Sequence, residues 1–336
     1  MSRAPAQNIV VTGASAGIGR ATAIAFARRG CNVALLARGR EGLEGARRDV
    51  EAAGGRAHAI QADVADAASV LQAADEVAAR WGSIDVWVNN AMATVFGPAE
   101  RVPASDWKRV TEVTYLGTVY GTLAALKHMR VRDAGTIVQI GSALAYRSIP
   151  LQAAYCGAKS AVCGFTDSLR SELLHEGSSV RLTMVQLAGV NTPQFSWSRT
   201  HAAKRHQPVG SVYQPEPVAE AIVGAALQAP RELWVGYPAV QAILGNMAVP
   251  ALLDRHLAAT AYDEQMSELP ARSGDPGILF SPAGSDGGTR GRFSDAAADT
   301  VATFDPGTLR AGVALAAAAA IAGAFLLGKR AASKPS

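Results

Sequence analysis

The stretch Thr12-Gly13-Ala14-Ser15-Ala16-Gly17-Ile18-Gly19 lies near the start of the chain, between a short apolar run and a helical pattern. Its glycines allow a tight turn and a close approach of the backbone to a phosphate group. A helix that begins at such a turn presents free N–H groups and the positive end of its dipole. Because many turns are rich in glycine, the position between a first strand and a first helix is the stronger signal. We therefore predict that Gly13, Ser15, Gly17, Ile18 and Gly19 bind a dinucleotide.

The pattern around this stretch repeats along the chain, because short apolar runs alternate with longer helical patterns from residue 8 to about residue 236. The expected strands are residues 9–12, 32–37, 57–61, 86–89, 136–141, 181–186 and 232–235. The clearest expected helices are residues 17–29, 66–81, 105–129 and 153–174. Strict alternation is typical of a parallel sheet with helices on both faces. We predict an α/β fold with a Rossmann-like, doubly wound parallel sheet of seven strands.

The domain organisation follows from changes in composition. Residues 1–250 are expected to form a nucleotide-binding catalytic domain, and residues 251–270 a terminal helical extension. Within the first unit, residues 188–214 interrupt the alternation and form a long connection that could close over an active site. Residues 271–310 are rich in Gly, Ser, Asp, Pro and Arg, which predicts a flexible linker.

The last feature is the run 311–328, which contains no charged residue and is followed by Lys329 and Arg330. As a helix it would be about 27 Å long, which is just enough for a bilayer core. We predict a transmembrane or membrane-associated helix over residues 311–330. The alternative is an alanine-rich surface or disordered tail, because half of the run is alanine.

The charge and the cysteines limit the classes of function. A net charge of +4 is mild for 336 residues and does not resemble the dense basic patch of a nucleic-acid-binding protein. Cys156 and Cys163 would lie about 10 Å apart on one helix, too far for a disulfide. With Cys31 they form no familiar metal-site spacing, which indicates a reducing compartment. No apolar signal segment precedes residue 8, so we expect the catalytic domain in the cytosol.

The end of the second expected strand indicates which nucleotide is preferred. Many dinucleotide folds place an acidic residue there to bind the ribose 2′-hydroxyl, whereas this chain has Arg38, with Arg40 nearby. An arginine at this position favours a 2′-phosphate. The alternative is a solvated charge at the start of a helix. We predict NADP(H) as the cofactor.

Two residues four apart on an expected helix, Tyr155 and Lys159, project from one helical face. A phenol is a poor base near neutral pH, but a neighbouring ammonium stabilises the phenolate and lowers its pKa. Tyr155 could then exchange a proton with an alcohol or carbonyl while hydride moves to or from a nicotinamide. Ser142 follows an expected strand, at the sheet edge where ligands bind, and could polarise the substrate oxygen. Its alternative role is to cap the strand end.

These motifs together resemble the short-chain dehydrogenase/reductase family over about residues 8–245. The resemblance rests on the stretch 12–19, on Asn89-Asn90-Ala91, on Ser142, and on Tyr155-Cys156-Gly157-Ala158-Lys159, in that order. It implies that Lys159 also holds the nicotinamide ribose and that the enzyme is a homo-oligomer. The resemblance implies further cofactor contacts from Asp63, Val64, Asn90, Ala91 and Thr192.

The chain also departs from the family pattern. Thr114 stands where the family has an asparagine whose backbone carbonyl holds a water linked to the lysine. A threonine can bond back to its own helix and is less suited to distorting it, so we expect a weaker proton relay. Met92 replaces a family glycine after Ala91, and the family's Pro-Gly pair is missing from residues 187–192. These changes bear on turnover more than on cofactor binding.

The substrate pocket is expected between residues 92–96, residues 143–149 and the connection from Gln194 onward. The expected apolar wall consists of Met92, Val95, Phe96, Leu144, Tyr146, Phe195 and Trp197. It predicts a hydrophobic alcohol or ketone as substrate. The basic cluster of Arg199, His201, Lys204, Arg205 and His206 could instead meet an anionic group or form a solvated face. The alternative function is a membrane-tethered, NADP(H)-sensing scaffold with impaired catalysis. A third hypothesis, a sugar-nucleotide epimerase on a related fold, fits the glycine spacing less well.

Overall fold

A central parallel sheet organises the fold. The computed structural model describes residues 6–271 and 275–308. The parallel strands are β1 (Asn8–Thr12), β2 (Asn32–Ala37), β3 (Arg56–Gln61), β4 (Val86–Asn89), β6 (Thr136–Ile140), β7 (Arg181–Leu187) and β12 (Glu232–Val235). Their spatial order is β12-β7-β6-β4-β1-β2-β3. Successive strands are therefore added on one side of β1 up to β3 and on its other side from β4 onward. This change of side is where ligands bind in open α/β sheets.

The sheet contains one strand more than expected. All seven expected strands are present, but β15 (Thr303–Phe304) pairs antiparallel with β12 and makes an eighth. This strand has only two residues, too few for an alternating apolar pattern to identify it. The Rossmann-like, doubly wound prediction is confirmed, whereas the strand count of seven is wrong.

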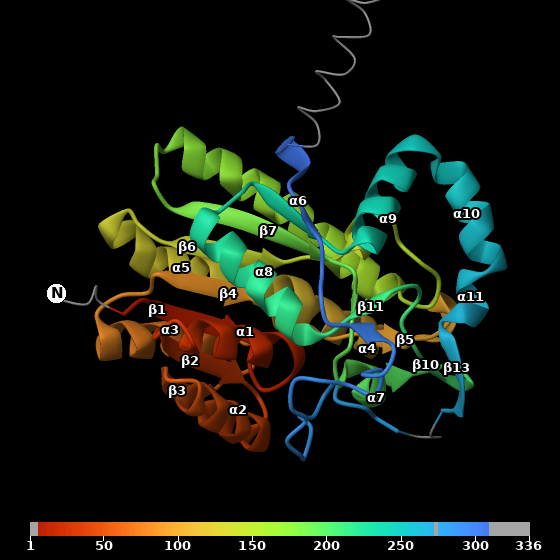
Figure 1. The fold of residues 1–336 in the computed structure, drawn as a ribbon, viewed down its shortest axis with the longest axis horizontal. Coiled ribbons are helices and arrows are strands. Elements are labelled where there is room, and N and C mark those ends of the chain that lie inside the picture. Colours follow the sequence, from red (N-terminus) through yellow and green to blue (C-terminus); the bar gives the residue numbers. More distant parts are fainter. Residues whose placement is uncertain (1–5, 272–274, 309–336) are drawn as a thin grey trace, which may run out of the picture.

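Helices cover both faces of the sheet, as Figure 1 shows. One face carries α1 (Gly17–Ala27), α2 (Arg40–Ala52) and α8 (Pro215–Gln228). The other carries α3 (Ala67–Trp81), α4 (Ala104–Thr111), α5 (Gly117–Arg132) and α6 (Ala153–His175). Strand side chains alternate between the two cores: Ile9 and Val11 pack on the α1 side, and Val10 packs on the α3 side.

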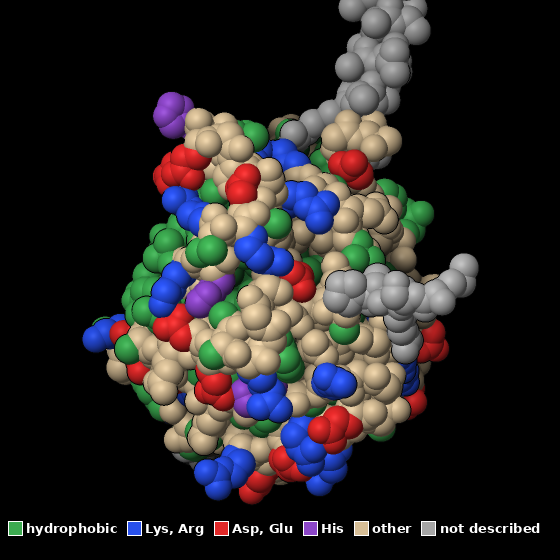
Figure 2. All heavy atoms as spheres, turned by 90° about the vertical axis from the view of Figure 1, so that its left-hand side faces the viewer, with side chains coloured by type: hydrophobic (Ala, Val, Ile, Leu, Met, Phe, Trp, Pro, Cys, Tyr) green, Lys and Arg blue, Asp and Glu red, His purple; other side chains and the backbone are tan. Residues whose placement is uncertain are grey.

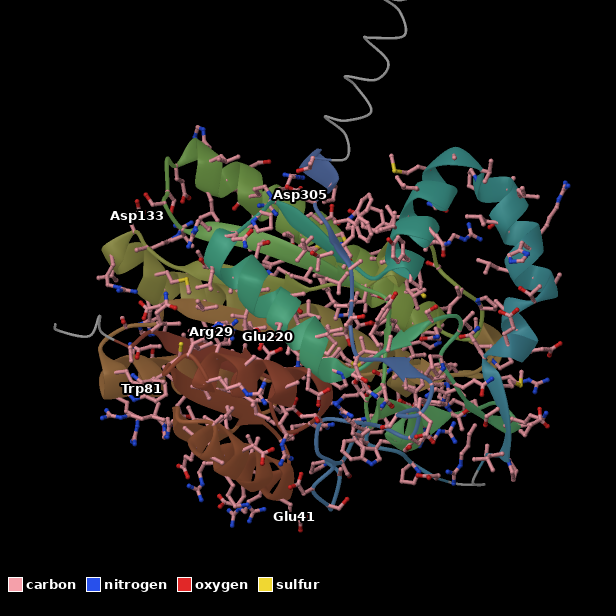
Figure 3. All side chains as sticks on the ribbon, in the orientation of Figure 1. Arg29, Glu41, Trp81, Asp133, Glu220 and Asp305 are labelled. Atoms are coloured by element: carbon pink, nitrogen blue, oxygen red, sulfur yellow. The ribbon has the colours of Figure 1, made fainter. Side chains whose placement is uncertain are left out.

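Charged side chains lie mainly outside these layers. Figure 3 shows Arg29, which follows α1, beside Glu220 of α8, and the two form a half-exposed ion pair of 2.7 Å. Figure 2 looks onto the amino-terminal edge of the strands, where basic and acidic side chains are interspersed. The opposite, carboxyl edge of the sheet holds the residues singled out from the sequence.

Smaller elements build walls at this carboxyl edge. The short strands are β5 (Val95–Phe96), β8 (Gly189–Val190), β9 (Arg199–Thr200), β10 (Lys204–His206), β11 (Val212–Tyr213), β13 (Met266–Pro270) and β14 (Ala297–Ala298). The short helices are η1 (Ala99–Arg101), η2 (Glu112–Leu116), η3 (Ala143–Ala145), α7 (Gln194–Trp197), α9 (Tyr237–Ala248), α10 (Pro250–Ala259) and α11 (Ala261–Glu264). In Figure 1, α9 and α10 form a hairpin to one side of this edge.

The chain after β13 differs from the flexible linker expected over residues 271–310. Residues 275–308 follow one path across the carboxyl edge, past α1 and α2, and end on β12 (Figure 1). Several residues of this segment hydrogen-bond to the domain; for example, Asn191 donates to Ser294 and accepts from the amide of Phe293. Polar, glycine-rich composition is therefore compatible with packing on the domain, as residues 275–308 show here.

No helix among the described residues is long and apolar enough to cross a membrane. The predicted membrane helix over residues 311–330 lies outside the described residues.

Candidate active site

A cavity of about 610 Å³ opens along the carboxyl edge of the sheet. It brings together most residues that the sequence predicted for the site. The lining residues from that prediction are Gly13, Ser15, Gly17, Ile18, Arg38, Asp63, Val64, Asn90, Ala91, Ser142, Tyr155, Lys159 and Thr192. Gly19 and Thr114 were expected at the site but do not line it.

The glycine-rich stretch forms a tight loop between β1 and α1. Gly13 and Gly17 have φ angles of +66° and +56°, which favour glycine. A Cβ atom on Gly13 would lie 2.8 Å from the Cα of Ala91, and one on Gly17 would lie 3.1 Å from Thr192 Cγ2. Gly19 packs against the Gly13 carbonyl instead of facing the cavity. No side chain caps the start of α1, and the Gly17 amide donates to the Gly288 carbonyl at 3.0 Å, so the anion-binding capacity of this helix start lies in the amides that follow Gly17.

Hydrogen bonds from the end of β4 fix this loop. The amides of Asn90 and Ala91 both donate to Thr12 Oγ1 at 3.0 Å. The Asn90 side chain donates to the carbonyls of Thr12 and Gly13 at 2.9 and 3.3 Å. Asn89 lies beneath, fully hydrogen-bonded to Trp87, Thr122 and Gln139. These contacts hold two neighbouring strand ends in register beside the cavity.

The end of β2 holds a pair of guanidinium groups. Burial first, and then the positive charge of Arg109, lower the pKa of Arg38. Arg109 forms an ion pair with Asp63, the residue expected at the adenine edge. One carboxylate therefore faces two guanidinium groups, which favours the binding of a further anion. The sequence reasoning missed Arg109, because it lies on α4, 71 residues from Arg38.

Ser142, Tyr155 and Lys159 meet at the end of β6. Ser142 accepts a hydrogen bond from the Leu144 amide at 3.1 Å and so caps η3. Tyr155 and Lys159 lie one turn apart on α6. Lys159 is 2% exposed, and its ammonium donates to the Ile140 carbonyl at 2.6 Å and lies 5.8 Å from the centre of the Tyr155 ring.

The electrostatics of this group differ from the simple expectation. Burial raises the pKa of Tyr155 above its ordinary value, and hydrogen bonding by Ser142 opposes this rise only in part. Burial also lowers the pKa of Lys159 to about 8. The expected lowering of the tyrosine pKa is therefore outweighed by desolvation in this structure. A further positive charge near the phenol would be needed to favour the phenolate.

Thr114 does more to its helix than expected. The helix from α4 to α5 widens into a π-helical turn, η2, around Thr114. The Thr114 hydroxyl does not bond back to its own helix, but donates to the Ala93 carbonyl and accepts from the Ala93 amide. The helix is thus distorted here, although a threonine was expected to be less suited to distorting it, and the hydroxyl pairs with the Ala93 backbone. The Thr114 carbonyl accepts the Thr118 hydroxyl at 2.9 Å.

The substrate end of the cavity has a largely apolar wall. Met92, Leu144, Phe195 and Trp197 line it as predicted, whereas Val95 and Phe96 are core residues and Tyr146 hydrogen-bonds Glu232 outside it. The sequence reasoning missed the wall contributed from α9 and α10. The lining residues from these helices are Pro238, Gln241, Ala242, Leu253, His256 and Leu257.

The basic cluster of the long connection does not line the cavity. Arg199 and His201 both bind the buried Asp106, at 2.7 and 2.8 Å. Burial lowers the pKa of His206 to about 3, and its ring stacks on Phe96. These three side chains serve the packing of the connection, so the expected anion-binding role is not supported for them.

Comparisons with known proteins agree with this geometry. A family model described as short chain dehydrogenase matches residues 7–203. The uncharacterized oxidoreductase YxnA of Bacillus subtilis is 34% identical over 276 residues, covering 82% of this chain and 78% of that protein. The cis-4-hydroxycyclohexanecarboxylate dehydrogenase of Sinomonas cyclohexanicum is 36% identical over 228 residues, covering 66% and 89%. An alcohol dehydrogenase structure from the archaeon Thermococcus sibiricus, complexed with 5-hydroxy-NADP, matches with a TM-score of 0.60 and 28% identity, covering 68% and 96%.

Proposed function

The chain belongs to the short-chain dehydrogenase family and is an oxidoreductase by that membership, and on this premise we propose a more specific activity. It transfers hydride between NADP(H) and a hydrophobic alcohol or ketone, with Tyr155 as the general acid and base. The observation that carries this proposal is the meeting of Ser142, Tyr155 and Lys159 with the glycine-rich loop in one cavity. A proton donor, a polarising hydroxyl and an anion-binding helix start are the groups that such a reaction needs.

The residues present fit a dinucleotide. Gly13 and Gly17 let the loop pack closely against Ala91 and Thr192, and the cavity continues from Arg38 past this loop to Tyr155. When bound, the nicotinamide would supply or accept the hydride and, in its oxidised form, a positive charge. Thr192, which lines the cavity beside Gly17, would bind the carboxamide end.

The choice of NADP(H) rests on the two guanidinium groups of Arg38 and Arg109. A 2′-phosphate offers oxygens that match a guanidinium fork, whereas a free ribose hydroxyl would leave the excess positive charge unpaired. The Thermococcus sibiricus relative was complexed with an NADP derivative, which supports this choice.

The roles of the catalytic residues follow from their positions. Ser142 donates a hydrogen bond to the substrate oxygen, and Tyr155 gives a proton to that oxygen during reduction or takes it during oxidation. Lys159 holds the ribose and, when protonated, favours the phenolate. Its lowered pKa, about 8, keeps it able to accept and return a proton near neutral pH.

The substrate class follows from the apolar wall formed by Met92, Leu144, Phe195, Trp197 and Leu257. Such a wall favours an apolar ring or chain next to the reacting oxygen. The Sinomonas cyclohexanicum relative is named for a cyclic alcohol, which is consistent with this class.

The proposal is tested by NADPH oxidation with a panel of cyclic and long-chain ketones, and with short polar ketones as controls. Turnover of the apolar ketones above the polar ones is expected. NADPH binding without turnover of any ketone or alcohol would instead favour the scaffold function. Failure to bind either nucleotide would overturn both.

A further inference from the structure

Residues 277–291, here called the strap, form the outer wall of the nucleotide part of the cavity. The lining residues from the strap are Ile278, Leu279, Pro282, Ala283, Ser285 and Gly287. We infer that the strap must open for NADP(H) to enter and leave, and that Asp286 is the positioning residue that keeps it closed. This inference rests on the proposed function, because it concerns the nucleotide of that same site.

The strap is fixed at both ends. At its start, the Ile278 amide donates to the Trp197 carbonyl at 2.9 Å. At its end, the Gly291 amide donates to the carbonyl of Asn191 at 3.2 Å, and Asn191 is fully buried. Both anchors belong to the connection after β7, so the stretch between them can move outward without unfolding the sheet.

The first contact between these anchors is at the adenosine end. The Arg38 guanidinium donates to the backbone carbonyls of Ile278, Leu279 and Phe280, at 2.6, 3.3 and 3.2 Å. Arg109 Nε donates to the same Leu279 carbonyl at 3.2 Å. A guanidinium has five N–H donors, so Arg38 keeps two for a phosphate while the strap orients it. The strap thus covers the adenosine subsite and fixes the orientation of the Arg38 guanidinium.

The second contact is at the phosphate loop. The Gly17 amide donates to the Gly288 carbonyl at 3.0 Å. This amide is the first of α1 and faces the position expected for the pyrophosphate. One N–H cannot serve both acceptors at full strength, so a bound pyrophosphate requires the strap to give up this hydrogen bond. The position of the strap and the binding of the nucleotide therefore depend on each other through the Gly17 amide.

The third contact is an ion pair in which both Asp286 oxygens face Arg20, the residue directly after the glycine-rich stretch. The Arg20 side chain is only 5% exposed and also binds Asp49 at 2.8 Å, which fixes its direction. Asp286 is 35% exposed and additionally accepts the Gly288 amide at 3.1 Å. Asp286 therefore joins the middle of the strap to α1 and places the Gly288 carbonyl over the Gly17 amide.

A reversible crosslink tests whether the strap must open. A Cβ atom on Gly39 would lie 3.3 Å from Pro282 Cβ, close to the 3.5–4.5 Å found between the Cβ atoms of a disulfide. Gly39 has φ −88°, which suits a cysteine. In the full-length Gly39→Cys, Pro282→Cys protein, we expect NADPH association followed by stopped-flow fluorescence to be at least about tenfold slower when oxidised than when reduced.

The matched control is the wild type with and without reductant, because its own cysteines are Cys31, Cys156 and Cys163 and form no disulfide. Equal association rates in the oxidised and reduced forms of the crosslinked protein would overturn the inference. Failure of the wild type to bind NADPH or NADH at all would overturn the proposed function as well, so the two failures are distinguishable.

A second variant tests Asp286. Asp286→Asn keeps the size of the side chain and removes its charge, and Asp295→Asn is the control, since Asp295 is exposed just beyond the strap. Asp286→Asn should raise both the association and the dissociation rate of NADPH, each by about threefold to tenfold, with a smaller change in Kd. Dissociation is measured by displacement with excess NADP⁺. A faster dissociation with unchanged association would show lost affinity instead of an opened strap and would overturn the role of Asp286.

Discussion

The Thr114 hydroxyl and the Ala93 backbone satisfy each other completely: the hydroxyl donates to the Ala93 carbonyl and accepts from its amide, at 2.9 Å in both cases. Thr114 is fully buried, so neither backbone group has water as an alternative partner. This pairing joins the π-helical turn to the loop that carries Met92 into the cavity.

Thr114→Val should therefore destabilise the protein, because it leaves two buried backbone groups of Ala93 unpaired at nearly constant side-chain volume. We expect a loss of about 1–3 kcal/mol in the free energy of unfolding, measured by urea denaturation. Thr114→Ser keeps the hydroxyl and is the control. Equal stability of the valine variant and the wild type would contradict this role.

Tyr155→Phe should abolish most turnover while leaving NADPH binding nearly unchanged, because only the proton-transferring hydroxyl is removed. A fall in kcat of about 10²-fold or more is expected, the usual scale for loss of general acid–base catalysis. Steady-state kinetics on an accepted ketone, with NADPH affinity measured by fluorescence, check it. Near-normal turnover would assign proton transfer to another group.

Arg38→Ala should weaken NADPH binding selectively. The variant removes the two N–H donors of Arg38 that the strap leaves free for the 2′-phosphate. NADH has no 2′-phosphate and therefore makes no such contact. The Kd of NADPH should rise by roughly tenfold to a hundredfold, as expected for charge-assisted hydrogen bonds worth about 1.5–3 kcal/mol. The Kd of NADH is the internal control, and wild-type protein that binds NADH as tightly as NADPH would refute the preference.

The buried Lys159 should make stability depend on pH. Its pKa is about 8 in the folded protein and 10.5 when unperturbed, so between these values the unfolded chain binds more protons. The free energy of unfolding contributed by this residue should then rise with pH, by at most about 1.4 kcal/mol per pH unit. Below pH 8, Lys159 is protonated in both the folded and the unfolded chain, so the free energy of unfolding carries the full cost of burying its charge.

This pH effect is measured by urea denaturation of the nucleotide-free protein from pH 7.5 to 9.5, a window chosen to lie below the ordinary pKa of Tyr155 at 10.0. Lys159→Met is the comparison, since it keeps the length of the side chain without the charge. Parallel pH profiles for the two proteins would show that Lys159 stays protonated in the fold.

Deletion of residues 309–336 tests the predicted membrane helix. The uncharged run 311–328 is long enough for a bilayer core, so the full-length chain should sediment with membranes and the shortened chain should not. NADPH affinity of the shortened chain is the control, because it retains the whole cavity. The same distribution of both proteins in cell fractions would refute the tether.

Local patterns were sufficient for the sheet and for most of the site. The alternation of apolar runs and helical patterns identified β1, β2, β3, β4, β6, β7 and β12, and parallel strands bring their carboxyl ends to one edge. Gly13, Arg38, Asn90 and Ser142 therefore had to lie close together once their strands were identified. The four-residue spacing of Tyr155 and Lys159 likewise placed both on one face of α6.

Only the tertiary structure decided what encloses this edge. Arg38 meets Ile278 across 240 residues, and Arg20 meets Asp286 across 266, without any period or spacing that connects them in the sequence. The one local hint was the apolar run 277–280 inside a polar stretch, where Leu279 is 2% exposed. From composition, residues 275–308 were predicted to be part of a linker. Composition does not separate the two cases, because glycine and aspartate are equally suited to solvent and to close contact with another backbone. Which of these partners such residues meet depends on the folded surface beside them, and that surface exists only after the sheet has formed.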